Sequence, residues 1–575
     1  MTKRKEKKEI SLEELKLFLC DWSQRVQNRS PLETIFQIEN TPLSWFYRPI
    51  IYSSLLPQPF PTINDIRQNK TINKKKLFLT LASFKKYLLL NDKLKEKISK
   101  KNEEKENTIQ PENTPQQQEQ LQDKSKNKIQ KKKSPKILFL TFTNHLSENN
   151  NLFRINQIVQ KIKTDQKYAP FLLVVDPITR ISIKKIYQKN NTLYSYYDPK
   201  IEQKAKDISL SLTQHWQNIT PQQKEQALTN YNKSGDRIEY YPLIKYHLNL
   251  LYSQEFIYLV AKWYLTYQKI ILQEQIKSIV LTSQNNIFEK CLIAAAKSQN
   301  ISVFIIQHGI GLGTLSTIDT PDNVKFAIFG KKYITELTRL GVNKKNIEIT
   351  GPIIFDEITT YIDTISKYTN KSNNNSINTE RSEQPLHSPE SKTILLATSP
   401  FIEDRFLTKD QYFERVTSIL TQLRTVTKKI NLKLHPRERN LSKYKKIVQQ
   451  LQIASIISFD TDRHNHYQLI HNCDLVITFG STVALEGMIM GKPTLTIDLF
   501  DNHNPTNGLI INSGATTIVK YNQPLTSLIQ NLLIQDPKQQ RANAFIKELC
   551  YKIDGKASER IVKYIYKEIE RQNII

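Results

Sequence analysis

The chain has little of what builds disulfide frameworks, metal clusters or membrane spans. Its 575 residues include only four cysteines, which lie far apart and form no CxxC pair. A structural zinc site or a disulfide scaffold is therefore not expected, and a reducing compartment fits this cysteine usage. The sequence contains no run of about 18 apolar residues, and its basic N-terminus is not followed by the apolar core of a signal peptide. We expect a cytoplasmic protein that would serve any membrane process from the inner face of the cell membrane.

Acidic residues are scarce relative to basic ones. Lys and Arg number 83 against 55 Asp and Glu, a formal net charge of +28. This excess favours acidic partners, which include nucleic acid, an anionic membrane face and phosphorylated substrates, and the charge alone does not choose among them. Because no RNA-binding aromatic motif or helix-turn-helix is present, we expect no specific nucleic-acid partner. The length predicts two or three domains.

Polar stretches divide the chain. Residues 96–134 are rich in Lys, Glu, Asn and Gln without an aromatic residue, which predicts a disordered linker, and residues 367–392 form a second polar linker. Residues 1–95 are predicted to be helical. Within them, the apolar segment Leu43–Pro57 is interpreted either as part of a small subdomain packed on the main body or as a contact with a membrane interface or lipid-linked acceptor.

Short apolar runs alternate with helical stretches in the remaining two parts of the chain. Runs such as KILFLTF (136–142) and DLVITF (474–479) are typical of buried parallel strands, and their alternation with helices indicates βαβ units. The sequence therefore predicts an α/β fold with two Rossmann-like domains facing a cleft and a helical N-terminal extension. The acceptor-side domain is placed at 135–366 with a helical insertion, and the nucleotide-binding domain with closing helices at 393–575.

The turn after the strand predicted at 474–479 is one candidate phosphate site. Gly480 permits a tight turn, and Ser481 and Thr482 open a predicted helix whose N–H groups and hydroxyls favour an anion. Glu486 lies four residues after Thr482 on the same helix face, where it can accept hydrogen bonds from a ribose or base. The alternative is that Ser481 only caps the helix and Glu486 is a surface charge.

A second candidate is the segment KLHPRER at 433–439. His435 stands at the carboxyl end of a predicted strand, the edge where open α/β sheets bind ligands. Pro436 stiffens the turn, and Arg437 supplies positive charge for a phosphate. The alternative is a structural or solvated histidine.

A third candidate is the QHG loop in the first domain. His308 follows a predicted strand between Gln307 and Gly309, and three of the chain's 13 glycines lie within 309–313. Such a concentration suggests a backbone that approaches a ligand closely. His308 can act as a general base or, as the imidazolium, donate to a phosphate, and the alternative is a glycine-rich turn with an incidental histidine. His145, after the first strand, is a weaker candidate for the same cleft.

Together the QHG loop, the KLHPRE turn, the segment GSTVALEGMIMGKP and the late segment DGKASERI (554–561) resemble GT-B enzymes of capsule and cell-surface polysaccharide synthesis. That group includes CDP-glycerol glycerophosphotransferases, Kdo transferases and bacterial sialyl- and polysialyltransferases, and it neighbours UDP-GlcNAc 2-epimerase-like proteins. The resemblance implies a cytidine or uridine nucleotide donor. It implies that His435 and Pro436 hold the nucleotide, that Ser481 and Thr482 hold its phosphate, and that His308 faces the reaction centre, with Gln307 and Gly309 beside it at the substrate.

The sequence departs from parts of this group. It lacks the paired-acid-Gly motif of the sialyltransferases and the Trp of the glycerophosphotransferase loop, and no DxD stands at a strand end of the two domains. A metal-independent reaction without a further cofactor is therefore expected.

The leading hypothesis is a transferase that moves a sugar or polyol phosphate from a nucleotide-sugar or CDP-polyol donor to a glycan or lipid-linked acceptor. His308 would deprotonate the acceptor hydroxyl or assist the leaving phosphate. One alternative is a sugar-nucleotide epimerase of the same architecture. The other is a basic, non-enzymatic protein that binds polyanions or a membrane.

Overall fold

The computed structural model describes residues 37–43, 45–47, 134–141, 152, 155–175, 191–227, 229–231, 237–239, 245, 248–284, 286–309, 320–374, 392–404, 406–435, 437–438, 440–460, 466–501 and 508–574. His145, Pro436, Gly311, Gly313, nearly all of the linker predicted at 96–134 and most of the linker predicted at 367–392 lie outside these residues. The second linker prediction is wrong for residues 367–374, which continue helix α15 (Asp356–Asn374).

The first domain is built on a parallel sheet with the strand order β11-β10-β9-β8-β3-β4-β5. The strands are β3 (Lys136–Thr141), β4 (Ala169–Val174), β5 (Asn191–Thr192), β8 (Ile276–Leu281), β9 (Ser302–Ile306), β10 (Val324–Ile328) and β11 (Ile347–Ile349). The chain winds outward from β3 to β5 and then returns to β8 on the other side. The strand order therefore reverses between β3 and β8, which makes this the switch point of the sheet.

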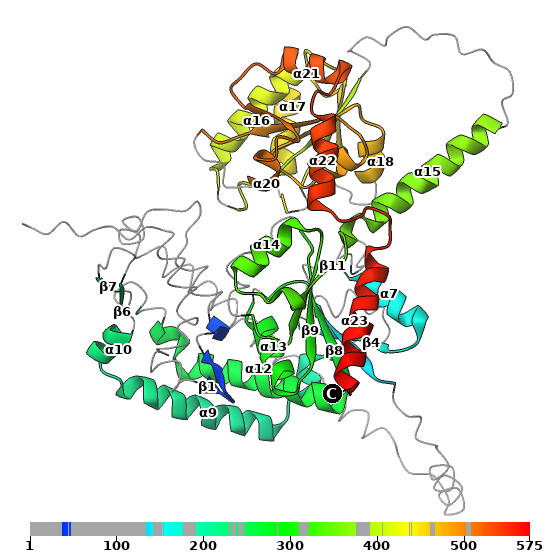
Figure 1. Cartoon of the computed structure of the whole chain (residues 1–575). Coiled ribbons are helices and arrows are strands. Elements are labelled where there is room, and N and C mark those ends of the chain that lie inside the picture. Colours follow the sequence, from blue (N-terminus) through cyan, green and yellow to red (C-terminus); the bar gives the residue numbers. More distant parts are fainter. Residues whose placement is uncertain are drawn as a thin grey trace, which may run out of the picture.

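The second domain repeats the same plan with the strand order β14-β13-β12-β15-β16-β17. Its strands, all parallel, are β12 (Thr393–Ala397), β13 (Lys429–Lys433), β14 (Ile457–Asp460), β15 (Leu475–Thr478), β16 (Thr494–Asp498) and β17 (Thr517–Lys520). The switch point lies between β12 and β15. The prediction of two Rossmann-like domains is confirmed, and they are stacked one above the other in Figure 1.

Helices cover both sheets because their apolar stripes pack on strands that are buried on both faces. Capping boxes start α13 at Asn286 and α16 at Thr408. The helices are α7 (Asn156–Asp165), α9 (Pro199–Asn218), α10 (Pro221–Ala227), α12 (Gln254–Gln273), α13 (Ile287–Ser298), α14 (Lys332–Arg339), α15 (Asp356–Asn374), α16 (Lys409–Leu423), α17 (Leu441–Gln450), α18 (His466–His471), α19 (Val483–Ile489), α20 (Gly508–Ile511), α21 (Thr526–Ile534), α22 (Gln539–Leu549) and α23 (Ala557–Ile574), with short 3-10 turns η2 (Leu193–Tyr196), η4 (Lys344–Asn346) and η5 (Ile353–Phe355). A small hairpin, β6 (Thr229–Tyr231) and β7 (Arg237–Glu239), follows α10. None of the described helices is both long and apolar enough to cross a membrane.

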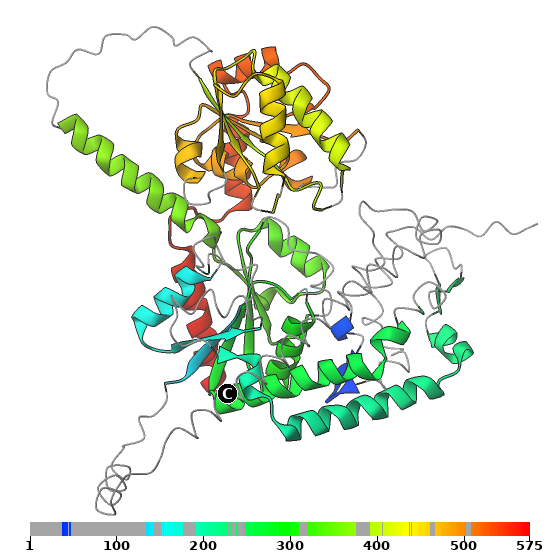
Figure 2. The same cartoon turned by 180° about the vertical axis from the view of Figure 1, so that it is seen from behind.

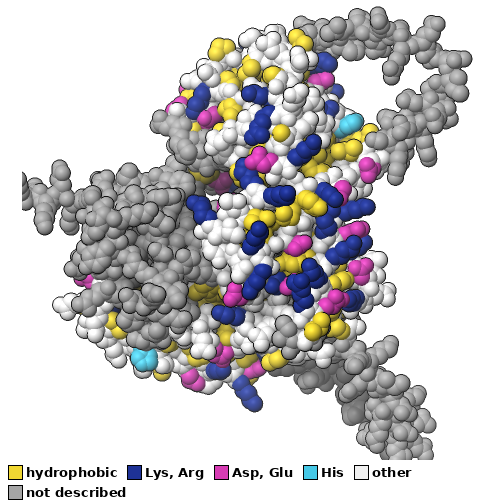
Figure 3. All heavy atoms as spheres, in the orientation of Figure 1, with side chains coloured by type: hydrophobic (Ala, Val, Ile, Leu, Met, Phe, Trp, Pro, Cys, Tyr) yellow, Lys and Arg dark blue, Asp and Glu magenta, His cyan; other side chains and the backbone are white. Residues whose placement is uncertain are grey.

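The last helix leaves the second domain and packs on the first. Both views show α23 running beside α7 (Figures 1 and 2), where Lys161 pairs with Glu559 at 3.2 Å. The sequence assigned this helix to the part of the chain that forms the second domain, because periodicity reveals an apolar face without revealing what covers it. Lys and Arg side chains gather over this surface but are interleaved with acidic ones (Figure 3), so part of its positive charge is neutralised locally.

The carboxyl edges of the two sheets face each other. Tyr551 N, at the end of α22, donates to the carbonyl of Phe329 just after β10 at 2.8 Å. Beside it Gly330 is needed, since a Cβ there would lie 2.4 Å from the Leu549 carbonyl oxygen. On another side, Tyr467 OH donates to the carbonyl of Ile354 at 3.4 Å. Residues that follow β10 and β11 in the first domain thus contact α18 and the end of α22 in the second domain.

The described N-terminal residues begin with a β-hairpin where the sequence predicted helix, whereas residues 43 and 45–47 are helical as predicted. β1 (Gln37–Ile38) pairs antiparallel with β2 (Thr41–Pro42). The side chains of Leu43, Phe46 and Tyr47 are fully buried in the core of the first domain. For these residues the interpretation as a segment packed on the main body holds, and residues 48–57 lie outside the described part of the chain.

Candidate functional site

Three strand ends of the second domain meet at its switch point. Ala397, the last residue of β12, is in register with Lys433 on β13 and with Thr478 on β15. Two residues beyond this row stand Ser399, His435 and Gly480. Because neighbouring strands are about 4.8 Å apart, the backbones at the two predicted turns are separated by roughly 10 Å across the end of β12. The tertiary structure therefore joins two motifs that lie more than one helix apart in the sequence.

The sequence predicted the strand that forms β12, but did not single out its end as part of the site. Thr398 and Ser399 lie between the two turns, and both are buried. The only local signal was the hydroxyl pair in LLATSP directly after an apolar run. Its importance depends on the strand order, which the sequence does not state.

His435 has a defined pattern of hydrogen bonds. Its Nδ1 accepts a hydrogen bond from the backbone N–H of Arg437 at 3.1 Å. In the neutral imidazole the hydrogen then resides on Nε2, which makes Nε2 a donor. Such a nitrogen suits an acceptor atom on a ligand, for example a phosphate or ribose oxygen.

Glu438 holds the backbone of this turn. Its Oε2 accepts hydrogen bonds from Thr398 Oγ1 and, at 2.7 Å, from His435 N. Its Oε1 accepts from Tyr444 OH at 2.8 Å and from Tyr412 OH at 3.2 Å. The carboxylate thus ties β12, β13, α16 and α17 together under His435. Burial raises the pKa of Glu438, although these hydrogen bonds act in the opposite direction.

Arg437 points away from the turn. Its guanidinium forms a bidentate ion pair with Asp404, at 2.6 and 2.8 Å, and its side chain is 57% exposed. A planar fork matched to a carboxylate in this way matches a phosphate equally well. The contact with phosphate predicted for Arg437 requires an exchange of partners.

The FGST turn has the expected backbone but a short helix. Gly480 has a φ of 91°, a conformation that favours glycine, and Ser481 Oγ accepts a hydrogen bond from Val483 N at 3.3 Å. Helix α19 starts at Val483 and spans only seven residues, so its macrodipole contributes less than the sequence suggested. The polar groups offered here are the hydroxyls of Ser481 and Thr482 and the backbone before the helix.

Glu486 is mostly buried and lies beside a histidine that the sequence did not single out. The Oε2 atom of Glu486 lies 3.4 Å from Nε2 of His466. The imidazole of His466 in turn stacks at a tilt on Tyr467, with ring centroids 3.9 Å apart. Glu486 is therefore not a simple surface charge. The pairing could not be predicted, because His466 follows β14, which lies three strands away from β15 in the sheet.

In the first domain, His308 is held by the neighbouring strand. Its Nδ1 lies 2.6 Å from the carbonyl oxygen of Thr282, directly after β8. Since a carbonyl only accepts, Nδ1 carries the hydrogen, and in the neutral ring Nε2 carries the lone pair. His308 and His435 thus present opposite tautomers, the first with a basic Nε2 and the second with an Nε2–H donor.

The residues flanking His308 have different environments. The Gln307 side chain is buried and bridges the loop to β10, because its Oε1 accepts from Phe329 N at 2.9 Å and its Nε2 donates to the Gly309 carbonyl at 2.9 Å. Gln307 therefore shapes the loop from within. A Cβ placed on Gly309 would meet no atom within 4 Å, so packing does not require glycine there.

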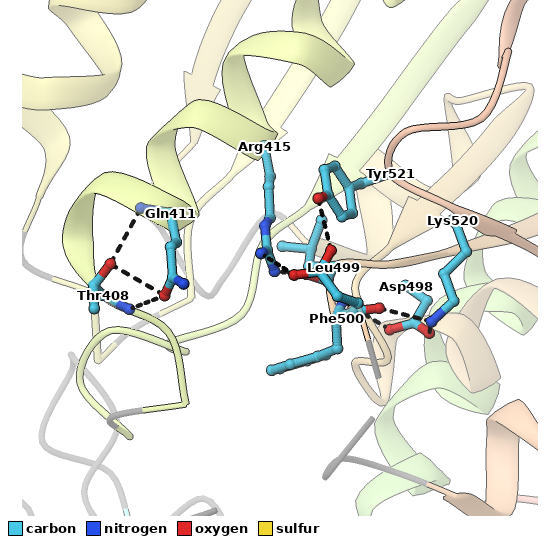
Figure 4. A network of polar contacts seen from close by, with 9 residues as sticks. Thr408, Gln411, Arg415, Asp498, Leu499, Phe500, Lys520 and Tyr521 are labelled. Carbon is cyan, nitrogen blue, oxygen red and sulfur yellow. Dashed lines mark hydrogen bonds and ion pairs between the residues drawn. The ribbon is translucent and has the colours of Figure 1, made fainter. Parts of the chain in front are cut away.

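A further network secures the carboxyl ends of β16 and β17 (Figure 4). The buried Arg415 donates to the carbonyl of Leu499 and pairs with Asp501 at 2.7 Å. Lys520 Nζ lies 2.6 Å from Asp498 Oδ2, and Tyr521 OH donates to Asp501 at 2.8 Å. These contacts hold the segment that follows β16, one strand beyond the FGST turn.

Among the residues that the structure describes, no cluster of three or more His, Cys, Asp or Glu side chains is arranged to hold a metal ion.

Comparison with known families then bears on the second domain. Residues 356–499 match the family model for capsule polysaccharide biosynthesis proteins. The matched segment contains both the KLHPRER and the FGST turns, so the resemblance inferred from these motifs is confirmed there. The first-domain loop with His308 lies outside the match. Among curated proteins, no match to this chain is found.

Solved structures with a similar chain path include sugar-nucleotide enzymes. The UDP-GlcNAc 2-epimerase from Neisseria meningitidis, bound to UDP-GlcNAc, is 12% identical with a TM-score of 0.45, over 75% of this chain and 100% of that one. The S. aureus MnaA–UDP structure is 11% identical, with a TM-score of 0.43 over 76% and 97%. A glycosyltransferase from Rickettsia africae ESF-5 is 12% identical, with a TM-score of 0.40 over 76% and 99%. Structural similarity at these identities and TM-scores shows neither the reaction nor the ligand of this chain.

Proposed function

We propose that this chain is a glycosyltransferase-like enzyme of cell-surface or capsular polysaccharide biosynthesis. It would transfer a sugar or polyol phosphate from a nucleotide-activated donor to a glycan or lipid-linked acceptor, without a metal ion. The observation that carries the proposal is the convergence of His435, Ser399 and the FGST turn at the switch point of the second sheet, where open α/β sheets bind ligands. The family match over the same segment supports the biosynthetic context.

In this proposal the second domain holds the donor. The Nε2–H of His435 donates to the nucleotide, and the hydroxyls of Ser481 and Thr482 donate to its phosphate. Glu486 accepts from a ribose or base, with His466 keeping its carboxylate in place. Charge that grows on the leaving phosphate is met by these fixed donors, and by Arg437 once it exchanges Asp404 for phosphate.

The first domain supplies the base. Nε2 of His308 takes the proton from the acceptor hydroxyl, whose oxygen then attacks the transferred group while the bond to the nucleotide phosphate breaks. The hydrogen bond from Nδ1 to the carbonyl of Thr282 orients the ring and stabilises the imidazolium that forms. The facing carboxyl edges of the two sheets bring acceptor and donor together. A lipid-linked acceptor would place the enzyme at the inner face of the cell membrane.

Nucleotide binding tests the donor site. Thermal unfolding is followed in the presence of CMP, CDP, UDP and GDP for the wild type, His435→Ala and His215→Ala. His215 is an exposed histidine on α9 and serves as the matched control. We expect one nucleotide class to raise the Tm of the wild type and of the control, and to raise that of His435→Ala much less. If none of the four nucleotides changes the Tm of the wild type, the proposal is wrong.

The role of His308 is tested by turnover. His308→Ala should bind the nucleotide identified above with unchanged affinity and lose turnover by a factor of about 10²–10⁴, the usual contribution of a general base. Unchanged turnover excludes the role. Conversion of a UDP-sugar without any acceptor would instead identify an epimerase.

A further inference from the structure

A cavity of about 300 Å³ lies between the N-terminal hairpin, α13 and the residues that precede β10. Asn40, Thr41 and Trp45 line one side of it. Lys297, Thr320 and Asp322 of the first domain line the other. We call this cavity the hairpin pocket. It exists only because the N-terminal segment packs on the Rossmann-like domain.

The hairpin wall is held rigidly. Its two turn residues, Glu39 and Asn40, have φ angles of 44° and 67°, as the tight two-residue turn of a hairpin requires. The Glu39 carboxylate accepts hydrogen bonds from Gln268 Nε2 at 2.7 Å and Tyr264 OH at 2.9 Å on α12. Burial acts to raise the pKa of Glu39, but the hydrogen bonds from Lys204, Gln268 and Tyr264 outweigh it and lower the pKa. Asn40 is thereby fixed at the rim.

The indole of Trp45 is fixed as well. Trp45 is 6% exposed, and Lys290 Nζ on α13 lies 4.0 Å from the centroid of its ring, which is a cation–π contact. The pocket thus offers part of a fixed indole ring together with amide and hydroxyl groups that can both donate and accept.

This chemistry fits a neutral, hydroxylated ring. The charges of Lys297 and Asp322 cancel, so the pocket favours neither an anion nor a cation. An acyl chain would leave the amide group of Asn40 and the hydroxyl group of Thr41 without partners, which is costly. A sugar satisfies them through its hydroxyls and lays its C–H groups against the indole. The volume stands at the lower end of the range for ligand sites, which leaves space for one small ring.

The pocket is within reach of His308. Gln284 Nε2 donates to Thr320 Oγ1 at the rim at 3.0 Å. Gln284 is two residues beyond Thr282, whose carbonyl holds His308. Since two residues span at most about 7 Å, the rim and the His308 ring are at most about 20 Å apart. On an extended glycan this distance corresponds to a few sugar residues.

We propose that the hairpin pocket binds one neutral sugar residue of the acceptor glycan, a few residues away from the hydroxyl that reacts. This proposal rests on the proposed function. It gives the N-terminal segment a part in acceptor recognition.

Ligand-observed saturation-transfer NMR on the full-length protein tests the pocket, with glucose, galactose and N-acetylglucosamine as separate probes. We expect transfer to at least one of them, unchanged by excess UDP or CMP. The double variant Lys297→Ala/Asp322→Ala should weaken it severalfold, and Ala294→Leu, which fills the cavity from α13, should abolish it. Lys345→Ala removes an exposed lysine elsewhere on this domain and should leave it unchanged.

The outcomes separate the two proposals. No transfer to any probe, or equal transfer in the wild type and Ala294→Leu, means that the cavity is a packing void and overturns the pocket. Nucleotide shifts of the Tm, measured on the same samples, report on the donor site. Nucleotide binding without sugar binding rejects the pocket alone, whereas sugar binding without nucleotide binding retains the pocket and rejects the donor site. Should Ala294→Leu fail to fold, the double variant, whose side chains are exposed, still decides.

Discussion

Replacing Glu438 tests whether the buried carboxylate holds the turn that carries His435. Four donors converge on it, and each has a second partner. Tyr412 and Tyr444 are 2.9 Å apart and can bond each other, and His435 N can fall back on Thr398 Oγ1 at 3.2 Å. An unsatisfied buried donor costs about 1–3 kcal/mol. Because each donor has this second partner, we expect Glu438→Ala to lower the free energy of unfolding by about 3 kcal/mol in total, and not by several times that amount.

Glu438→Gln should be far milder. The backbone N–H of His435 can only donate, so the glutamine must place its carbonyl oxygen there. Its NH₂ group then faces the hydroxyls of Tyr412 and Tyr444, which can rotate to accept. We expect a loss of about 1 kcal/mol, the net value of one ordinary hydrogen bond.

Thermal unfolding and nucleotide titration provide the assay. For a domain of this size, about 3 kcal/mol lowers the Tm by about 6–12 °C, and about 1 kcal/mol by about 2–4 °C. Nucleotide affinity should fall about tenfold in Glu438→Ala, equivalent to about 1.4 kcal/mol, and little in Glu438→Gln. Glu414→Ala, at an exposed position on the same α16 as Tyr412, is the control. An unchanged Tm and an unchanged affinity in Glu438→Ala would refute the reasoning.

Three further predictions concern stability. Because burial raises the pKa of Glu438 above 4.5, its protonation favours the folded state. The stability that this provides is complete below pH 4.5 and is lost as pH rises through the folded pKa. Glu438→Gln should remove that part of the pH dependence of the unfolding free energy, measured by urea titrations at several pH values. Identical pH profiles for the wild type and Glu438→Gln would contradict this prediction. Arg415→Met leaves the Leu499 carbonyl without its donor and should lower the unfolding free energy by about 2 kcal/mol, which would appear as a lower urea midpoint. An unchanged midpoint would show that the network of Figure 4 is not needed for stability. A Cβ on Gly487 would lie 3.1 Å from Val476 Cγ2 and Thr494 Cγ2. Gly487→Val should therefore overpack α19 against the sheet and lower the unfolding free energy by about 2–3 kcal/mol, measured by the urea midpoint. A midpoint equal to that of the wild type would contradict this prediction.

The sequence by itself determined the local features of this protein. Apolar runs of strand length alternating with helices were enough to predict two Rossmann-like domains, because these patterns depend on neighbours within a few residues. The same locality explains why the Gly480 turn and the placement of His435 after a strand were predictable. In each case the residue type and its immediate surroundings carry the information.

Only the tertiary structure decided which of these features meet. The position of β12 between β13 and β15 brings His435 and the FGST turn together, and no local pattern encodes that order. The contacts of Glu438 with Thr398 and Tyr412 join residues 40 and 26 positions apart, and the same holds for α23 on the first domain and for Arg437 on Asp404. Such pairings follow from how whole elements bury their apolar faces. Periodicity shows that a face exists, and packing alone selects its partner.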